Sequence, residues 1–302
     1  MLIFVSQKKE SCQEIVVRGA TGQLGRHVVD GLTRAGRRVR AVSRHPTAGE
    51  PGVTPCRADV RDTEAFRSVL GGADAIFVNL PPGLNDQDLA RIGADIHRAA
   101  IPFTVLLSSD RVGSFPGSVM AASHTREESV LGAILGDSLV VLRPAMFMDN
   151  DAAEWWASIR DQGAVITAFP DALEVPIASV DIANAAVARL TAQRQKAHRM
   201  QRLVGPEWLS ARDRAAVLAE VLGRPIIIRE VSPDEHVAVL ARVRPMPIAR
   251  QKVMMLREAP RPIRDCPELS LGKERTRYSV WAAANAAAFG SRAAEPIRRG
   301  AT

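Results

Sequence analysis

Cysteine is scarce in this sequence, and the three cysteines that it has lie far apart. Cys12, Cys56 and Cys266 form no Cys-x-x-Cys pair and no Cys/His cluster with the spacing of metal ligands. Their separation argues against a structural zinc site and against a disulfide framework, so we expect no metal. Isolated cysteines are typical of a reducing compartment, and we therefore expect a cytoplasmic protein.

Long apolar runs are also absent. The sequence opens on an apolar stretch, residues 1–5, but Lys8, Lys9 and Glu10 end it too early for a signal-peptide core or a membrane span. We interpret residues 1–12 as an N-terminal extension and expect no membrane partner.

Acidic residues are outnumbered, since 33 of them face 40 lysines and arginines, which gives a net charge of +7. The basic excess is scattered along the chain. No helix-turn-helix, zinc finger or interleaved basic and aromatic stretch accompanies it. We therefore interpret it as a solvated basic surface and expect no nucleic-acid partner.

Short β-branched runs alternating with amphipathic stretches dominate the first half of the chain. Six runs are predicted as strands, at residues 15–17, 39–43, 53–57, 75–78, 103–107 and 139–142. Helices are predicted between them, at about 24–35, 63–70, 86–100 and 124–135. Continuous apolar strands that alternate with helices indicate a parallel sheet covered on both faces. With right-handed crossovers, the expected fold class is α/β, with a doubly wound parallel Rossmann sheet.

The alternation becomes irregular beyond Pro144. Ser210 and Ser232 are predicted to cap helices, and Gly223 to end the first of these. Further elements are predicted as helices at 180–192 and about 280–289 and strands at 202–204 and 226–231. The predicted domains are a Rossmann domain (13–150, with 176–206 returning to it), a smaller α+β substrate lobe (151–175 and 207–290) and a disordered tail (291–302).

A glycine-rich turn at residues 19–25 carries the strongest functional signal, because it follows a predicted strand and opens a predicted helix. Its glycines allow a tight turn, a close approach of the backbone to a pyrophosphate and close packing of the helix on the sheet. The helix N-terminus adds free N–H groups and the positive end of its dipole. We predict a dinucleotide site with contacts from Gly19, Thr21, Gly22, Gln23, Leu24 and Gly25.

The residues that end the second strand favour NADP(H) over NAD(H). Where an NAD-binding fold usually has a carboxylate for the ribose 2′-hydroxyl, this chain has Ser43 and Arg44. Arg44 can pair with a 2′-phosphate, and Arg18 can assist. The alternative is that both arginines face solvent.

Residues that follow other strands are also expected at the cofactor, because open α/β sheets bind ligands at the carboxyl ends of their strands. The alternative is that they are polar strand caps. The predicted contacts are Asp59, Val60, Asn79, Leu80, Pro81, Ser108 and Pro144.

Together these residues resemble the NmrA-like group of atypical short-chain dehydrogenases/reductases. The resemblance covers nearly the whole chain, and it includes the turn at 19–25, Arg44, and the stretches 124–128, 142–150 and 203–206. It implies NAD(P) binding more firmly than it implies a reaction, because the group includes quinone reductases, natural-product reductases and non-catalytic redox sensors.

One departure from the wider superfamily concerns the proton donor. Typical members use a Tyr-x-x-x-Lys pair on the helix after the fifth strand, but the one tyrosine here, Tyr278, lies far away and no such lysine follows it. His124 and Glu128 lie one helical turn apart instead. His124 is therefore a candidate general acid oriented by Glu128; it is alternatively a polar contact to the nicotinamide ribose or a helix-start residue.

Sulfur-containing and aromatic side chains are predicted to line a substrate pocket. The expected residues are Ser109, Met146, Phe147, Met148, Trp155 and Trp156. Core packing between the lobes is the alternative for them.

We expect an NADPH-dependent reductase, monomeric or homodimeric, that transfers hydride to an apolar conjugated small molecule such as a quinone, enone or iminium. Natural-product metabolism would be one setting for such a reaction. The alternatives are a non-catalytic NAD(P)-binding redox sensor and a non-redox cyclase or isomerase on the same scaffold.

Overall fold

The computed structural model of the chain describes residues 13–192, 199–258 and 275–290. Contacts divide the chain into two compact units. The first comprises the described parts of Met1–Leu107, Glu127–Val141 and Ala183–Arg199; the second comprises those of Ser108–Arg126, Leu142–Ile182 and Met200–Thr302. The predicted extension at 1–12 and tail at 291–302 lie outside the described residues, as do Cys12 and Cys266.

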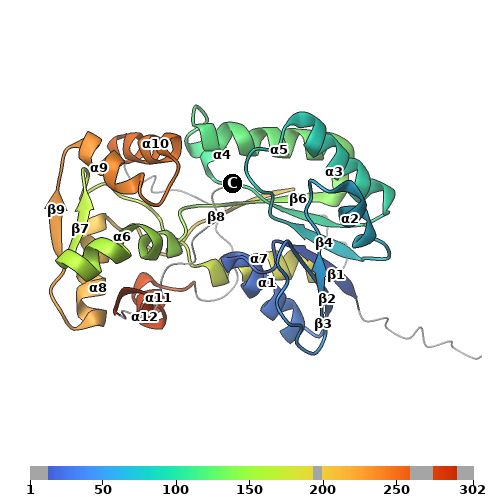
Figure 1. Ribbon diagram of the computed structural model, residues 1–302, viewed down its shortest axis with the longest axis horizontal. Coiled ribbons are helices and arrows are strands. Elements are labelled where there is room, and N and C mark those ends of the chain that lie inside the picture. The colour runs from blue at the N-terminus through green and yellow to red at the C-terminus, as the bar shows by residue number, and fades with distance from the viewer. Residues whose placement is uncertain (1–12, 193–198, 259–274, 291–302) are drawn as a thin grey trace, which may run out of the picture. The chain divides into compact units, whose positions relative to one another are not determined.

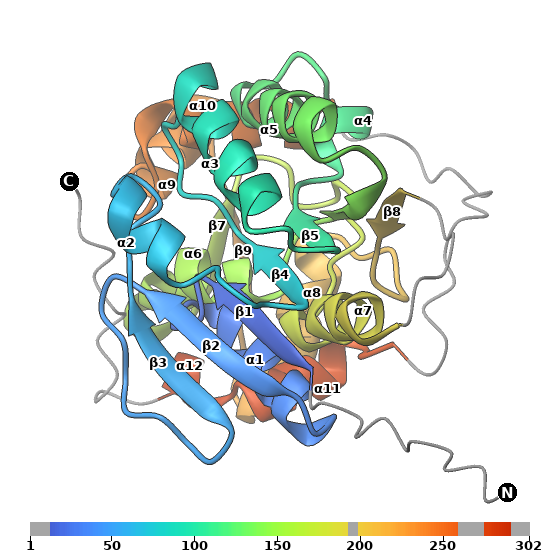
Figure 2. The same ribbon diagram turned by 90° about the vertical axis from the view of Figure 1, so that its right-hand side faces the viewer.

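Parallel strands form the centre of the first unit, in the order β3-β2-β1-β4-β5 (Figure 2). Their bounds are β1 (Glu14–Arg18), β2 (Arg38–Ser43), β3 (Val53–Arg57), β4 (Ala75–Val78) and β5 (Thr104–Leu107). Val16 lies opposite Arg40 of β2 on one side and Ile76 of β4 on the other. β6 (Leu139–Pro144) and β8 (Met200–Leu203) complete a seven-stranded sheet. The order reverses between β1 and β4 as in a Rossmann fold, which confirms the predicted fold class.

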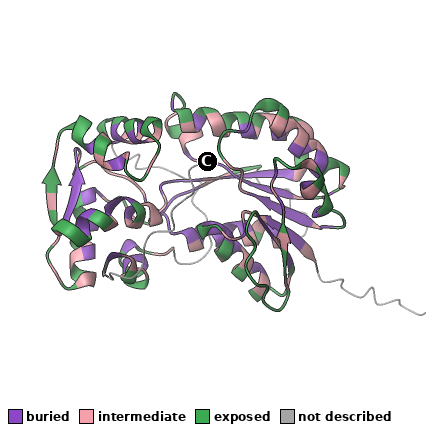
Figure 3. Ribbon diagram, in the orientation of Figure 1, coloured by how far each residue is buried: buried purple, intermediate pink, exposed green. Residues whose placement is uncertain are grey.

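Helices cover both faces of this sheet. α2 (Thr63–Ser68), α3 (Asp86–Arg98) and the end of α5 (Val119–Leu135) pack on one face in a single apolar cluster. α1 (Gln23–Arg34) and α7 (Ser179–Thr191) lie on the other face (Figure 2). A Cβ at Gly31 would come within 2.8 Å of Val187, so these two helices pack closely. Every residue of β4 and β5 is therefore buried (Figure 3), which explains their continuous apolar sequence.

Helices predominate in the second unit (Figure 1). They are α4 (Arg111–Ser114), α6 (Asp149–Gln162), α8 (Ala211–Leu222), α9 (Pro233–Leu240), α10 (Met246–Arg257), α11 (Tyr278–Ala284) and α12 (Ala287–Gly290). Two strands, β7 (Ala164–Thr167) and β9 (Ile227–Glu230), pair in parallel. An apolar cluster that includes Trp155, Leu218 and Trp281 forms its main core.

Two boundaries differ from the sequence-based expectations, and one strand was not expected. α5 begins at Val119 rather than near His124, so His124 is not a helix-start residue. The final predicted helix is interrupted at Asn285 and divides into α11 and α12. β7 was not predicted, because three apolar residues and a threonine between a helix and a proline-containing loop show no distinctive period.

Several local predictions match the structure. Ser210 caps α8 in a capping box with Asp213, and Gly223 ends that helix in the left-handed conformation. Ser232 caps α9, with Pro233 in its first turn. Across the residues that the structure covers, no helix has both the length and the apolar character needed to cross a membrane.

Candidate functional site

The turn between β1 and α1 has the geometry expected of a phosphate-binding loop. Gly19 adopts a positive φ of 83°, which favours glycine, and its N–H donates to the Val42 carbonyl at 2.9 Å. A Cβ at Gly25 would lie 2.0 Å from the Gly19 carbonyl oxygen, and one at Gly22 would lie 3.2 Å from it. A side chain at Gly25 would therefore clash with the backbone and disrupt the turn. A side chain at Gly22 would make a close contact with the same carbonyl oxygen.

The N-terminus of α1 is open to a ligand. Gly22 is the N-cap residue and supplies no side-chain hydrogen bond, and the first turn contains no acidic residue. The N–H groups of this turn thus have no side-chain acceptor, and the positive end of the helix dipole faces no carboxylate of that turn. An anion such as a pyrophosphate satisfies both.

Ser43, at the carboxyl end of β2, has an unsatisfied polar atom. The residue is 8% exposed, and its buried Oγ has no hydrogen-bond partner in the described part of the chain. Arg44 follows and is exposed. A buried hydroxyl without a partner is costly, so a ligand oxygen at this position would stabilise it.

Arginines gather at the same edge of the sheet. Arg18, the last residue of β1, donates from Nη1 to the Asn79 carbonyl oxygen. Burial lowers the pKa of Arg18 to about 10; the carboxylate of Asp59 opposes this shift, and the charges of Arg44 and Arg61 add to it. Arg44, Arg61 and Asp59 therefore all lie close enough to Arg18 to act on its charge.

Arg61 was missed by the sequence analysis. Its N–H donates to Asp59 Oδ1 at 3.0 Å, and its Nη2 donates to the Pro82 carbonyl at 3.0 Å. These contacts hold the loop after β3 beside the loop after β4. A basic residue two positions after Asp59 was the available signal, but only the fold brings it near Arg18.

Other predicted contacts in the first unit can act mainly through their backbone. The side chains of Leu24 and Val60 are buried, at 3% and 1% exposed. Leu80 packs against the apolar cluster that contains Val60. Thr21 and Pro81 are half-buried, and Gln23 is exposed, at the turn and at the loop after β4. Their predicted roles at the cofactor stay predictions.

The residues predicted after β5 and β6 lie together in the second unit. The Ser108 N–H donates to the Leu142 carbonyl at 2.8 Å, and the Asp110 N–H donates to the Pro144 carbonyl at 3.0 Å. Ser109 Oγ accepts from the Arg111 N–H at 3.3 Å.

Asp110 lies in the same group of residues and is a buried carboxylate. It was not predicted as a site residue. Burial raises its pKa. The guanidinium groups of Arg111 and Arg202 oppose this shift, with nitrogens that lie 3.8 Å and 3.4 Å from the carboxylate oxygens of Asp110. Its signal in the sequence was only its place two residues beyond Ser108.

His124 and Glu128 occupy neighbouring turns of α5, and both are half-buried. This agrees with the predicted spacing on one helix. The role of His124 as a general acid stays a prediction.

The predicted substrate-lining residues divide into buried and half-exposed ones. Met148 and Trp155 are buried in the apolar core of the second unit. Met146 is 7% exposed, whereas Phe147 and Trp156 are half-buried. Adjacent helical positions point in different directions, so Trp155 and Trp156 have different surroundings.

A buried ionic network in the second unit was not predicted. The Arg214 guanidinium, 2% exposed, donates from Nη1 to Asp151 Oδ1 and Oδ2 at 2.7 Å and 3.0 Å and from Nη2 to Glu174 at 2.9 Å. Tyr278 donates its hydroxyl proton to Asp151 at 2.8 Å. Burial raises the pKa of Asp151 to about 6, despite the opposing charge of Arg214. The hydroxyl of Tyr278, the single tyrosine of the chain, thus takes part in a buried hydrogen bond with Asp151.

Comparisons with known proteins agree with this reading of the glycine turn. The sequence model of the NAD(P)H-binding family matches residues 19–193. A relative from Streptomyces griseus, (4-alkanoyl-5-oxo-2,5-dihydrofuran-3-yl)methyl phosphate reductase, is 33% identical over 243 residues, 78% of this chain and 83% of the relative. An NAD(P)H azoreductase of Xenophilus azovorans is 27% identical over 219 residues, 70% of this chain and 75% of the azoreductase.

The fold is shared with a solved structure of NADPH-dependent quinone oxidoreductase from Escherichia coli, complexed with NADPH. The TM-score is 0.73 at 22% identity, covering 89% of this chain and 99% of the oxidoreductase. At this identity the likeness extends to the fold.

Proposed function

The chain belongs to the NAD(P)H-binding family, as its resemblance to the NmrA-like group predicted, and we propose that it is an NADPH-dependent reductase of apolar conjugated small molecules. The observation that carries the cofactor choice is the exposed Arg44 directly after Ser43 at the carboxyl end of β2, with Arg44 and Arg61 close enough to Arg18 to act on its charge. No part of this proposal requires a metal.

In this proposal the glycine turn and the start of α1 hold the pyrophosphate, and the end of β2 holds the 2′-phosphate. The Ser43 hydroxyl and the exposed Arg44 guanidinium donate to phosphate oxygens. Arg18 and Arg61 add positive charge nearby, while Arg18 stays attached to the Asn79 carbonyl. A 2′-hydroxyl would leave the positive charge that Asp59 does not balance without a counterion, so NADH binds more weakly.

The bound cofactor supplies a hydride to the acceptor. The chain binds and orients it, and the accompanying proton comes from water or from His124. Tyr278 does not take part as a donor, because burial and the neighbouring Asp151 raise its pKa well above the ordinary value and its hydroxyl already donates to Asp151. An acceptor that needs little protonic assistance therefore suits this chain.

The names of the relatives support a conjugated acceptor. An alkanoyl dihydrofuranone, an azo compound and a quinone each place electron-poor multiple bonds in conjugation, which favours hydride addition. Phe147 and Trp156 are half-buried, so we propose that part of each contacts such a ring.

The test is the loss of absorbance at 340 nm when the protein is mixed with NADPH and a panel of quinones, enones and azo dyes. We expect oxidation with at least one class, and a kcat/KM for NADPH at least about ten-fold above that for NADH. A control without acceptor corrects for slow oxidation by oxygen.

Two outcomes would contradict the proposal. Tight NADPH binding with no turnover by any acceptor would favour the redox sensor. Conversion of an acceptor without consumption of NADPH would favour the non-redox cyclase or isomerase.

A further inference from the structure

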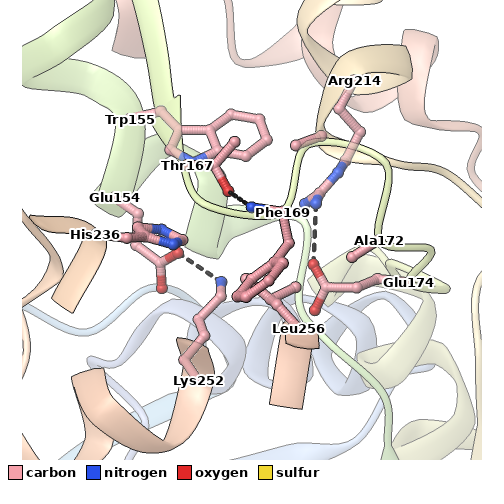
Figure 4. A pocket seen from close by; sticks show the side chains of 11 residues that line it. Glu154, Trp155, Thr167, Phe169, Ala172, Glu174, Arg214, His236, Lys252 and Leu256 are labelled. Carbon is pink, nitrogen blue, oxygen red and sulfur yellow. Dashed lines mark hydrogen bonds and ion pairs between the residues drawn. The ribbon is translucent and has the colours of Figure 1, made fainter. Parts of the chain in front are cut away.

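Helix α10 belongs to the second unit, and one side of it packs against that unit (Figure 1). Ala249 lies in a buried apolar cluster. Lys252 Nζ binds Glu154 Oε2 at 2.5 Å, which Figure 4 shows from close by. Gln251 Oε1 accepts the Met120 N–H of α5 at 3.3 Å. These three contacts span the inward side of the helix, so the residues on its opposite side face outward.

The outward side of α10 carries Met246, Arg250, Met254 and Arg257, and all four residues are exposed. They are spaced by four, four and three positions. This spacing places them within about 80° of one another around the helix. These four residues form the α10 face. Long apolar and long cationic side chains alternate along it, so the face is apolar and basic at the same time.

Exposed apolar side chains are concentrated around this face. In the part of the chain that the structure describes, eight large apolar residues are exposed, and four of them lie here, between 44% and 59% exposed: Val119, Val243, Met246 and Met254. Val243 lies in the turn before α10, and Val119 is the first residue of α5, whose second residue bonds to α10. Exposed apolar residues are ordinary when they are single, whereas a group of them marks an interaction surface.

The positive charge of this region is mostly unpaired. Segment 241–258 contains five basic residues, and two of them are held by a buried glutamate. The other three, Arg242, Arg250 and Arg257, are exposed, and no ion pair with them is found among the described residues. The one acidic residue of the segment, Glu258, comes at its end. A partner for the α10 face therefore has to supply negative charge.

The combination of charge and apolar surface distinguishes between possible partners. A second copy of the chain would bring the same arginines together, and like charges repel. A nucleic acid would satisfy the arginines but would place phosphates and sugars against Met246 and Met254. An anionic bilayer satisfies both kinds of side chain, because its phosphates lie beside its acyl chains. Methionine side chains are flexible, so they fit the irregular packing of lipid.

We propose that the α10 face binds the surface of an anionic membrane, with Arg250 and Arg257 at the level of the lipid phosphates and Met246 and Met254 among the upper parts of the acyl chains. The expectation of no membrane partner rested on the lack of a spanning segment, which a surface contact does not need. This interaction goes beyond the proposed reductase function and does not rest on it. It also suits that function, because apolar conjugated acceptors concentrate in a bilayer.

The experiment measures how much of the full chain sediments with sucrose-loaded vesicles. One set of vesicles is phosphatidylcholine alone, and the other contains equal parts of phosphatidylglycerol and phosphatidylcholine. The chain is saturated with NADP+, so that its cofactor site does not bind lipid phosphates and no hydride transfer is involved. We expect the partition coefficient to be at least about ten-fold higher for the anionic vesicles, and to fall as salt is added.

The variant Arg250→Gln/Arg257→Gln removes two charges from the α10 face. We expect its partition to the anionic vesicles to fall at least about ten-fold, because each cation at an anionic membrane contributes roughly five-fold. The matched control Arg34→Gln/Arg38→Gln removes the same charge from exposed positions of the first unit, and it should change the partition by less than about two-fold. An equal loss in the two variants would show that net charge, and not the α10 face, binds the vesicles.

The variant Met246→Gln/Met254→Gln keeps the charge and removes apolar surface, and it applies even if the arginine variant does not fold. We expect a loss of roughly five-fold in partition to the anionic vesicles. An unchanged partition would contradict the insertion of these side chains. Equal partition of the wild type to both sets of vesicles would overturn the proposal. Binding to poly-L-glutamate without binding to vesicles would overturn it too, because the face would then select an acidic macromolecule.

Discussion

Arg18 and Arg44 are the same type of residue, yet their surroundings give them different roles. Arg18 is held by the Asn79 carbonyl, and burial lowers its pKa to about 10. Arg44 is exposed, and no ion pair with it is found among the described residues. Arg44 is therefore the side chain that can turn to a cofactor phosphate, while Arg18 provides a charge held in place by the Asn79 carbonyl.

Replacing Arg44 should reduce the preference for NADPH. In Arg44→Ala the Kd for NADPH should rise roughly ten-fold, while the Kd for NADH changes little, because only NADPH carries the 2′-phosphate. Fluorescence titration of the intrinsic tryptophans with each dinucleotide measures both constants. Arg38→Ala, at the opposite end of β2, is the matched control and should leave both unchanged. Equal weakening of both dinucleotides in Arg44→Ala would contradict the assignment.

His236 should make the protein less stable in mild acid. Its pKa is about 4 in the folded chain, below the ordinary value of 6.5, so between these values the unfolded chain binds a proton that the folded chain does not. Stability from the neutral ring is therefore present at pH 7 and is lost as the pH falls.

Between pH 7 and pH 5, the free energy of unfolding of the wild type should fall by about 2 kcal/mol more than that of His236→Asn. Urea unfolding of both proteins at both pH values measures this difference. Other titrating groups, Asp151 included, are present in both proteins and cancel in the comparison. Parallel pH profiles would show that His236 is not held neutral by the fold.

Among the elements, the β1–α1 turn is the most constrained. Its glycines serve different purposes: Gly19 adopts a left-handed conformation, Gly22 begins a helix that has no side-chain cap, and Gly25 lies against the Gly19 carbonyl. By contrast, α8 begins with a full capping box between Ser210 and Asp213. The capped helix needs no ligand at its N-terminus, whereas the uncapped one leaves its N–H groups available to one.

Gly25→Ala should damage the turn more than a comparable substitution elsewhere. Its Cβ would lie 2.0 Å from the Gly19 carbonyl oxygen, which is backbone and cannot move aside cheaply. We expect a loss of about 3 kcal/mol in the free energy of unfolding, together with loss of NADPH binding. Gly71→Ala is the matched control, since no atom lies within 4 Å of the added Cβ. Thermal denaturation with and without NADPH measures both effects, and normal NADPH binding by Gly25→Ala would refute this account.

Considered as a whole, the molecule consists of two compact units. The first has an apolar core between a parallel sheet and its helices. The second has an apolar core and also a buried ionic network, in which Arg214 of α8 joins Asp151 of α6 and, through Asp151, Tyr278 of α11. Breaking one member leaves the others buried without a partner, which is costly.

Arg214→Leu should therefore destabilise the protein strongly. Removing the guanidinium leaves the carboxylates of Asp151 and Glu174 without their buried cation, and we expect a loss of about 3 to 5 kcal/mol in the free energy of unfolding. Arg229→Leu breaks an exposed ion pair with Glu235 and should change the free energy of unfolding by less than about 1 kcal/mol. Urea titration followed by circular dichroism gives both values. Similar small losses in the two variants would show that the network contributes little.

Local patterns were enough to predict most of the first unit. Five strands and the helix after the glycine turn match within about two residues, because buried parallel strands and capped helices have short-range signatures. The start of α5 and the strand β7 were not predicted correctly, because neither has a distinctive local signal. The candidate cofactor site was located through the glycines and Arg44, whereas Arg61 was not identified.

The sequence by itself determined the fold class, the position of the dinucleotide turn and the residue type at the end of β2. Each depends on neighbours within a few positions, which adopt the same local geometry wherever the segment lies. Only the tertiary structure decided that Ser43 Oγ has no partner among the described residues, that Arg61 lies near Arg18, and that His236 is buried with its Nδ1 accepting the Ala168 N–H. Burial and the surrounding charges govern these properties, and they arise only when segments distant in the sequence pack together.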